Sequence, residues 1–117
     1  MSNCKVIAIS NQKGWVGTTT TTLSLGVALA KLGKKVLLLD ADPQGDLTVC
    51  MGYYAQELNK NHQDKMKTIA TLIGSYINDI SLDINDVILH HKENIDLIPS
   101  NLDLSAMEIP LLNAMNR

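Results

Sequence analysis

The sequence lacks the features that define several classes of protein. Its two cysteines, Cys4 and Cys50, form no CxxC pair, and no run approaches the roughly 20 consecutive apolar residues of a membrane-spanning helix. The first residues also lack the apolar stretch of a secretory signal. The net charge of −2 offers no bulk attraction to nucleic acid or to an anionic membrane. These absences predict a cytoplasmic protein with no membrane association through this segment.

What is present describes an ordinary globular chain. Its 117 residues suit one small domain, and contents of 45% apolar and 19% charged residues argue against a disordered tail. We find no internal repeat and no linker. We therefore expect residues 1–117 to lie within a single domain.

The first 40 residues predict one strand–helix–strand unit. Residues 6–9 form an apolar run without polar alternation, which is typical of a strand buried on both faces of a parallel sheet. Apolar residues then recur at helical spacing over residues 18–32, and Gly33 follows as a stop. Val36–Leu39 reads as a second buried strand that ends at Asp40. Strand ends of this kind are where ligands collect in open α/β sheets.

Further along the chain the pattern predicts another helix and another strand. Apolar residues at i, i+3, i+4, i+7 and i+8 indicate a helix over Ile69–Ile77, with Thr68 as its N-cap. Residues 87–89 fit either a short strand or a turn of helix. Ile95–Ile98 reads as a third strand because it is an apolar segment that stops at a proline.

A last helix is expected near Ser105. The spacing from Ser105 to Glu108 matches a capping box. Pro110 would then fall in the second turn, which favours a kink or a broken start.

The loop over residues 11–17 is where the chemistry is expected. It leaves the first predicted strand and opens the first predicted helix, so its backbone amides and the positive end of the helix dipole can hold a phosphate group. Residues 42–46 are rich in turn-forming types and should form a second loop at the same edge of the sheet.

The sequence of the first loop resembles a known phosphate-binding motif. Residues 13–20, K-G-W-V-G-T-T-T, are similar to the deviant Walker A motif Lys-Gly-Gly-x-Gly-Lys-Thr-Thr of the ParA/MinD (Soj-like) family of P-loop ATPases, with six of eight places in agreement. Residues 40–48 and 97–101 resemble two further segments of that family in the right order. The resemblance covers the chain and the N-terminal half of the family domain. It implies an α/β fold, a partial P-loop NTPase (Rossmann-like) with a parallel sheet and flanking helices.

The resemblance also assigns roles to single residues. It implies that Lys13 reaches the nucleotide of a partner subunit and that Asp42 orients the attacking water, which makes these two the candidate catalytic residues. Thr19 would coordinate Mg²⁺ with Asp40 near the metal shell, and Thr20 would contact the α-phosphate. The implied ATP/ADP-binding set is Lys13, Gly14, Trp15, Val16, Gly17, Thr18, Thr19 and Thr20.

Two residues depart from the family motif. Thr18 stands where the family has the lysine that neutralises phosphate charge, and Trp15 stands where it has a glycine that lets the backbone approach closely. Charge-assisted hydrogen bonds are worth about 1.5–3 kcal/mol each, so we expect binding of Mg²⁺ and nucleotide to be weaker by roughly ten- to more than a hundredfold, or lost.

The resemblance implies a third departure. In the family, a strand that carries the Walker B aspartate follows the helix expected near residues 107–115 and lies between the first two strands. Without it the sheet would have two unpaired edges, so we expect the chain to self-associate as a dimer or a strand-exchanged oligomer.

Two functions follow as alternatives. The first is a ParA-like partition ATPase, whose intact relatives bind DNA non-specifically and respond to a ParB-like activator. The second is a truncated, non-hydrolysing remnant that acts only as an interaction or structural module. Asp40 and Asp42 could likewise serve only as turn residues that accept loop amides. A dinucleotide-binding oxidoreductase is excluded because no G-x-G-x-x-G follows the first strand.

Overall fold

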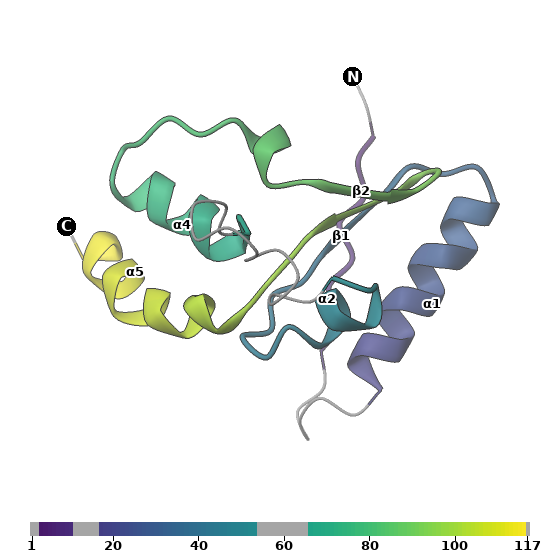
Figure 1. Cartoon of the computed structure of the whole chain (residues 1–117), viewed down its shortest axis with the longest axis horizontal. Helices are drawn as coiled ribbons and strands as arrows, with labels where there is room; N and C mark the ends of the chain where they lie inside the picture. Colours follow the sequence, from purple (N-terminus) through teal and green to yellow (C-terminus); the bar gives the residue numbers. More distant parts are fainter. Residues whose placement is uncertain (1–2, 11–16, 54–65, 117) are drawn as a thin grey trace.

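The computed structural model describes residues 3–10, 17–53 and 66–116 (Figure 1). Helices and strands are interspersed along these residues and pack together, which confirms the α/β class. The elements are α1 (Thr18–Lys31), β1 (Val36–Leu39), α2 (Asp46–Cys50), α4 (Ile69–Ile77), the 3-10 helix η1 (Ile84–Asp86), β2 (Leu89–Lys92), β3 (Ile95–Ile98), the 3-10 helix η2 (Leu102–Met107) and α5 (Glu108–Met115). Figure 1 shows α1 on one side of the sheet and the α4–α5 pair on the other.

The sheet has three strands in the order β1-β3-β2 and is mixed. β1 and β3 pair in parallel, from Val36 opposite Ile95 to Leu39 opposite Ile98, as predicted. β2 runs antiparallel to β3, so the expectation of an all-parallel sheet is wrong at this edge. Only two residues connect β2 to β3, and a link that short can join only antiparallel neighbours. The ambiguous residues 87–89 close η1 and begin β2.

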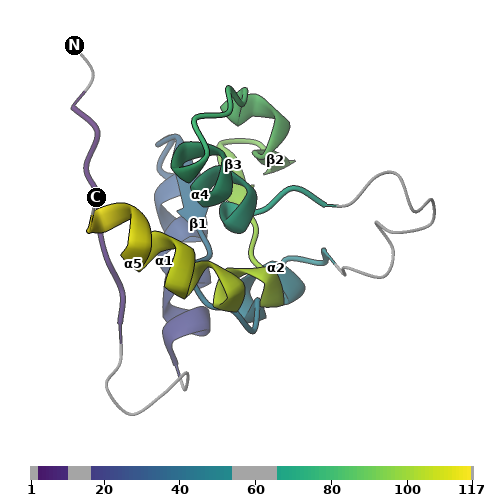
Figure 2. The same ribbon diagram turned by 90° about the vertical axis from the view of Figure 1, so that its left-hand side faces the viewer.

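The predicted first strand is not formed. Residues 6–9 have no strand pairing, and Val6 and Ile7 are 91% and 61% exposed. Figure 2 shows this N-terminal segment as an extended trace that runs apart from the helices and the sheet. A strand needs a hydrogen-bonded neighbour, and no described strand lies beside these residues. The apolar pattern of residues 6–9 is that of a buried strand, but such a pattern does not report whether a pairing strand lies beside it.

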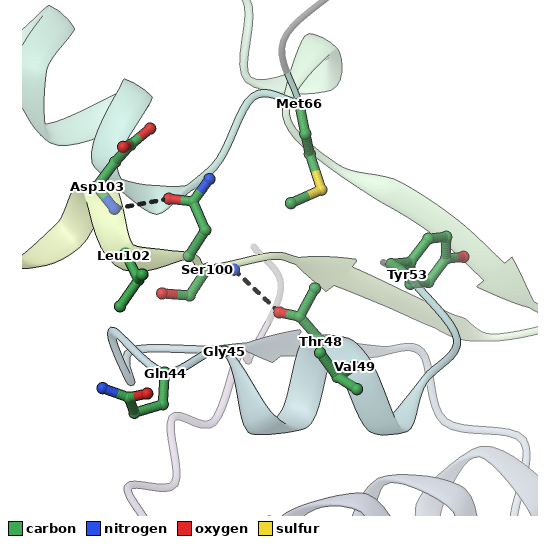
Figure 3. Close-up of a pocket in the computed structure, with 10 residues that line it drawn as sticks. Gln44, Gly45, Thr48, Val49, Tyr53, Met66, Ser100, Leu102 and Asp103 are labelled. Carbon is green, nitrogen blue, oxygen red and sulfur yellow. Dashed lines mark hydrogen bonds between the residues drawn. The ribbon is translucent and has the colours of Figure 1, made fainter. Parts of the chain in front are cut away.

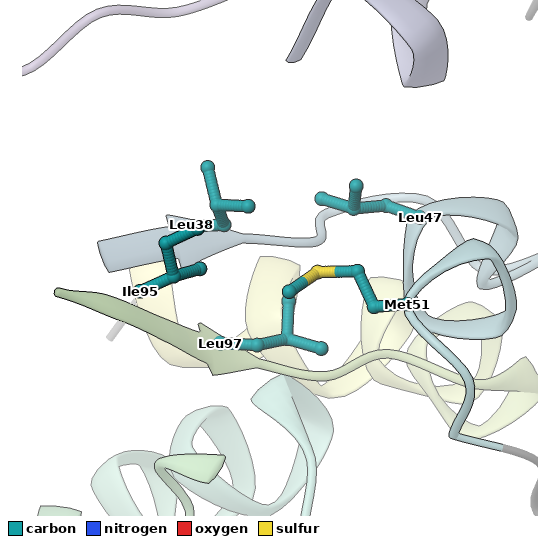
Figure 4. Close-up of a cluster of buried hydrophobic side chains, with 5 residues drawn as sticks. All are labelled: Leu38, Leu47, Met51, Ile95 and Leu97. Carbon is teal, nitrogen blue, oxygen red and sulfur yellow. The ribbon is translucent and has the colours of Figure 1, made fainter. Parts of the chain in front are cut away.

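The main core lies between α1, α2 and one face of the sheet. Its buried members are Leu38, Leu47, Met51, Ile95 and Leu97 (Figure 4). α1 comes close to β1 because Gly26 has no side chain: a Cβ there would lie 2.9 Å from a methyl carbon of Leu38. The helix ends as predicted, with Gly33 at a φ of 84° just beyond it.

The elements that follow form a second unit on the other side of the sheet. Thr68 caps α4 as predicted, accepting a hydrogen bond from the amide of Ala70 at 3.2 Å. The amide of Ile69 donates to the carbonyl of Pro99 at 2.9 Å, which ties α4 to the end of β3. α4 in turn contacts η2 and α5.

The start of the last helix differs from the prediction. Asn101, not Ser105, provides the cap, because its side chain accepts from the amide of Asp103 at 3.0 Å and opens η2. The α-helix begins only at Glu108, so the start is broken into two pieces as Pro110 suggested. Pro110 lies in the first turn of α5, where a missing N–H is tolerated.

Candidate functional site

The predicted phosphate loop is described only at its helical end. Lys13, Gly14, Trp15 and Val16 lie outside the described residues. Gly17 precedes α1 with a φ of 86°, in the left-handed region that favours glycine. The helix then begins at Thr18, at the position that the motif requires.

The first turn of α1 has the character of an anion site. Gly17 offers no side-chain cap, and the first helical hydrogen bond runs from the amide of Thr21 to the carbonyl of Gly17 at 2.9 Å. The amides of the first turn have no partner within the helix, and they stand at the positive end of the dipole. Thr18 and Thr19 are half-buried and Thr20 is exposed. These residues therefore fit a phosphate group, and Thr19 brings a hydroxyl of the kind that can bind Mg²⁺ beside it.

Asp40 lies where β1 ends, and its carboxylate accepts three hydrogen bonds. The residue is 3% exposed. Oδ1 accepts from the amide of Asp42 at 3.1 Å, while Oδ2 accepts from the amide of Thr48 at 3.0 Å and from its hydroxyl at 2.6 Å. The carboxylate thereby satisfies one of the free amides at the start of α2. Three of its roughly four acceptor positions are occupied.

Asp42 sits in the turn that follows. Its Oδ1 accepts from the amide of Gln44 at 3.0 Å, and its carbonyl accepts from the amide of Gly45 at 2.9 Å and from the hydroxyl of Ser100 at 2.7 Å. Both aspartates thus do what turn residues do. This is compatible with the chemical roles assigned to them, which stay predictions.

The start of α1 and the loop after β1 lie at one edge of the molecule. α1 and β1 run in opposite directions, so the start of the helix and the end of the strand lie on the same side (Figure 1). α2, which follows the second loop, contacts α1. The fold therefore brings Gly17–Thr20 and Asp40–Asp46 to the same edge.

A cavity of about 310 Å³ opens beside the second loop, between α2 and the start of η2 (Figure 3). Gln44, Thr48, Ser100 and Asn101 are among the polar residues that line it, and Met66 and Leu102 are among the apolar ones. The amide of Ser100 donates to the hydroxyl of Thr48 at 3.0 Å across one wall. Thr48 and Ser100 thus link the ends of β1 and β3.

The histidines are placed away from this corner. His90 and His91 lie inside β2. Nδ1 of His90 is 2.8 Å from a carboxylate oxygen of Asp96, and Nδ1 of His91 is 3.2 Å from the hydroxyl of Tyr53. Within the described ranges no group of three or more His, Cys, Asp or Glu residues could hold a metal ion. Those ranges also contain no helix long and apolar enough to cross a membrane.

Comparison with known proteins decides the family. A family model described as an AAA domain matches residues 4–117. The chain is 39% identical to the sporulation initiation inhibitor protein Soj of Bacillus subtilis over 117 residues, and 36% identical to the chromosome partitioning protein ParA of Caulobacter vibrioides over 107 residues. The chain belongs to the ParA/MinD family.

The alignments cover most of this chain but less than half of each relative. They cover 97% and 92% of this chain but 40% and 36% of the two relatives, so the chain spans well under half of their length. Among solved structures, cobyrinic acid a,c-diamide synthase from Mycobacterium smegmatis with bound ADP and magnesium aligns with a TM-score of 0.69 and 34% identity. That alignment covers 88% of this chain and 37% of the other. The ParA/MinD fold is thus present in the part that this chain shares with these proteins.

Sequence reasoning missed two residues of this corner. In the sequence, Thr48 and Ser100 stand out only as members of the family-like segments, yet both are 2% exposed and hydrogen-bonded to the loop that carries the aspartates. The sequence offers one signal for this link, which is that a hydroxyl residue follows each of two predicted strands. It was weak, because 52 residues separate the two.

Proposed function

We propose that residues 1–117 form the N-terminal part of one nucleotide-binding domain of a partition-type ATPase, which holds Mg-ATP or Mg-ADP on the loop over residues 13–20. The observation that carries this proposal is the uncapped start of α1 directly after Gly17, at the edge shared with the Asp40–Asp46 loop. Family membership supports it, as does the solved relative with bound ADP and magnesium.

In this proposal each residue contributes through its own chemistry. Lys13 supplies a positive charge to the nucleotide of a partner subunit, and Gly14 and Gly17 let the backbone curve around the phosphates. Thr19 offers its hydroxyl to Mg²⁺, with Asp40 near the metal shell, and the bound Mg²⁺ would neutralise charge on the phosphate oxygens. Asp42 orients the water that attacks the terminal phosphate.

We further propose that Thr18 weakens this site. A hydroxyl at the start of α1 donates one hydrogen bond and carries no charge, whereas the family lysine provides both. The absence of that cation is expected to lower affinity by roughly ten- to more than a hundredfold. Trp15 adds bulk where the family has glycine.

The second candidate is an interaction module that does not hydrolyse ATP. Thr18 and Trp15 favour it, because hydrolysis depends on electrostatic stabilisation of charge that develops on the phosphates. Both candidates share the ancestry and the fold, and they differ in whether the chain is part of a site that hydrolyses ATP. A chain that binds no nucleotide would fit only the second.

Self-association is the third part of the proposal. Within the described residues β1 pairs only with β3, so the backbone groups of its other edge have no strand partner. Leu37 and Leu39, on the sheet face opposite Leu38 and α1, are 50% and 51% exposed. An edge of unpaired backbone donors and acceptors favours pairing with another strand, so we propose a dimer or a strand-exchanged oligomer. The partition relatives suggest DNA and a ParB-like activator as further partners. Size-exclusion chromatography with light scattering should show a dimer or larger species, and a monomer at every concentration would contradict it.

Nucleotide binding can be tested directly, because Trp15 is the only tryptophan and lies in the loop. Its fluorescence is expected to change when Mg-ADP or Mg-ATP is added at millimolar concentration. The matched control is Thr18→Lys, which should shift the titration to roughly ten- to a hundredfold lower nucleotide. No response in either protein, with no heat in titration calorimetry, would favour the interaction module.

A further inference from the structure

We propose that Thr48 is a positioning residue, which holds Asp42 in place by tying the loop after β1 to the segment after β3. The functional meaning rests on the proposed function, in which the Asp42 carboxylate orients the attacking water. The tie itself is made by protein groups and can be tested without nucleotide.

The hydroxyl of Thr48 makes two hydrogen bonds in opposite directions. It donates to Oδ2 of Asp40 at 2.6 Å and accepts from the amide of Ser100 at 3.0 Å. The residue is only 2% exposed, so water cannot replace either bond cheaply. One side chain therefore joins the end of β1 to the end of β3.

The two residues that Thr48 joins are the ones that hold Asp42. Oδ1 of Asp40 accepts from the amide of Asp42 at 3.1 Å. The hydroxyl of Ser100 donates to the Asp42 carbonyl at 2.7 Å. The backbone of Asp42 is thus held from two sides, and Thr48 fixes the distance between them.

The loop also packs directly on the segment after β3. Gly45 has a φ of 67°, and a Cβ there would lie 2.8 Å from the carbonyl oxygen of Ser100. Backbone touches backbone at this point, so the loop cannot shift toward Ser100. The hydrogen bonds prevent a shift in the opposite direction.

Threonine is suited to this place for a reason that can be separated from its shape. Valine would fill the same space but would leave the amide of Ser100 without its acceptor and would remove one of the two hydrogen bonds that Oδ2 of Asp40 accepts. Serine would keep the hydroxyl and lose only a methyl group. The pair of variants therefore separates hydrogen bonding from packing.

The experiment is amide hydrogen exchange, read residue by residue by NMR, on the full chain and on Thr48→Val and Thr48→Ser. In Thr48→Val, exchange at the amides of Asp42, Gly45 and Ser100 is expected to accelerate about tenfold, from the loss of two buried hydrogen bonds. Thr48→Ser should stay within about twofold of the original chain.

The matched control is Thr68→Val. Thr68 is another buried threonine, 1% exposed, whose hydroxyl accepts from an amide in α4 and not in the loop. This variant should accelerate exchange at Ala70 and leave Asp42 and Gly45 unchanged. Equal acceleration in both regions by either variant would show a global loss of stability and would overturn the positioning role, as would unchanged exchange in Thr48→Val.

A milder variant covers the case in which Thr48→Val does not fold. Ser100→Ala removes only the bond from the Ser100 hydroxyl to the Asp42 carbonyl, so exchange at Gly45 should rise while the Ser100 amide stays protected. No change at Gly45 would overturn the proposal. If Mg-ADP does not bind, only the proposed function is contradicted. If amide exchange does not change as described, only the positioning role of Thr48 is contradicted.

Discussion

Two regions of β1 lie only a few residues apart but differ in burial and in hydrogen bonding. One is the corner where β1 and β3 end, and the other is the free edge of β1. At the corner, Asp40, Thr48 and Ser100 are buried, and the Thr48 hydroxyl is hydrogen-bonded to both of the others. The free edge of β1 has no strand partner among the described residues, and Leu37 and Leu39, on the sheet face opposite α1, are about half exposed. The apolar residues 6–9 also have no strand partner. The corner draws all its partners from the described residues. The edge needs a strand that these residues do not supply.

The largest expected effect on stability comes from a buried residue of β3, and a half-exposed residue of β1 provides the comparison. Leu97→Ala removes a fully buried side chain from the core and should lower the free energy of unfolding by about 2–5 kcal/mol. Leu39→Ala, at a half-exposed position, should cost about 1 kcal/mol or less. Urea titration followed by circular dichroism measures both. Equal losses would mean that the face of β1 that carries Leu37 and Leu39 is covered in solution.

The next prediction tests how tightly the corner is packed. Gly45→Ala puts a methyl group against the carbonyl of Ser100 and places alanine at positive φ, so it should destabilise the chain by about 1–3 kcal/mol. Gly33→Ala is the control, because Gly33 has a similar φ of 84° but nothing within 4 Å of its Cβ position. We expect Gly45→Ala to lower the melting temperature more than Gly33→Ala does. The reverse order would contradict the close contact with Ser100.

The smallest expected effect lies in the N-terminal segment. Val6 is 91% exposed, so Val6→Ala should change the free energy of unfolding by less than about 0.5 kcal/mol. Chemical denaturation at a protein concentration where the chain is monomeric checks this. A loss above about 1 kcal/mol would show that residues 6–9 are packed, and the contrast between corner and edge would fail.

Sequence alone predicted the elements whose signals are local. The helix from Thr18 and the capped helix after Thr68 follow from spacing within one element, and Val36–Leu39 and Ile95–Ile98 follow from short apolar runs. α2 was missed because five residues are too few to show a helical period. The pattern of residues 6–9 was that of a buried strand, but burial depends on a neighbour that no local pattern reports.

The candidate site could likewise be predicted only where its signals are local. The position of the helix start after Gly17 and the placing of Asp40 at a strand end came from motif and spacing. The use of the Asp40 carboxylate by Thr48, and the link from Thr48 to Ser100, depend on which strands become neighbours. Such contacts join residues far apart in sequence, so they appear only once the sheet order is known.

The central claim is that this chain carries a ParA/MinD nucleotide site weakened by two substitutions. Isothermal titration calorimetry of Mg-ADP into the double reversion Trp15→Gly with Thr18→Lys tests it most directly, with circular dichroism to confirm that the variant is folded. The account predicts saturable binding at least about tenfold tighter than that of the original chain. A folded double variant that releases no binding heat at millimolar nucleotide would contradict it.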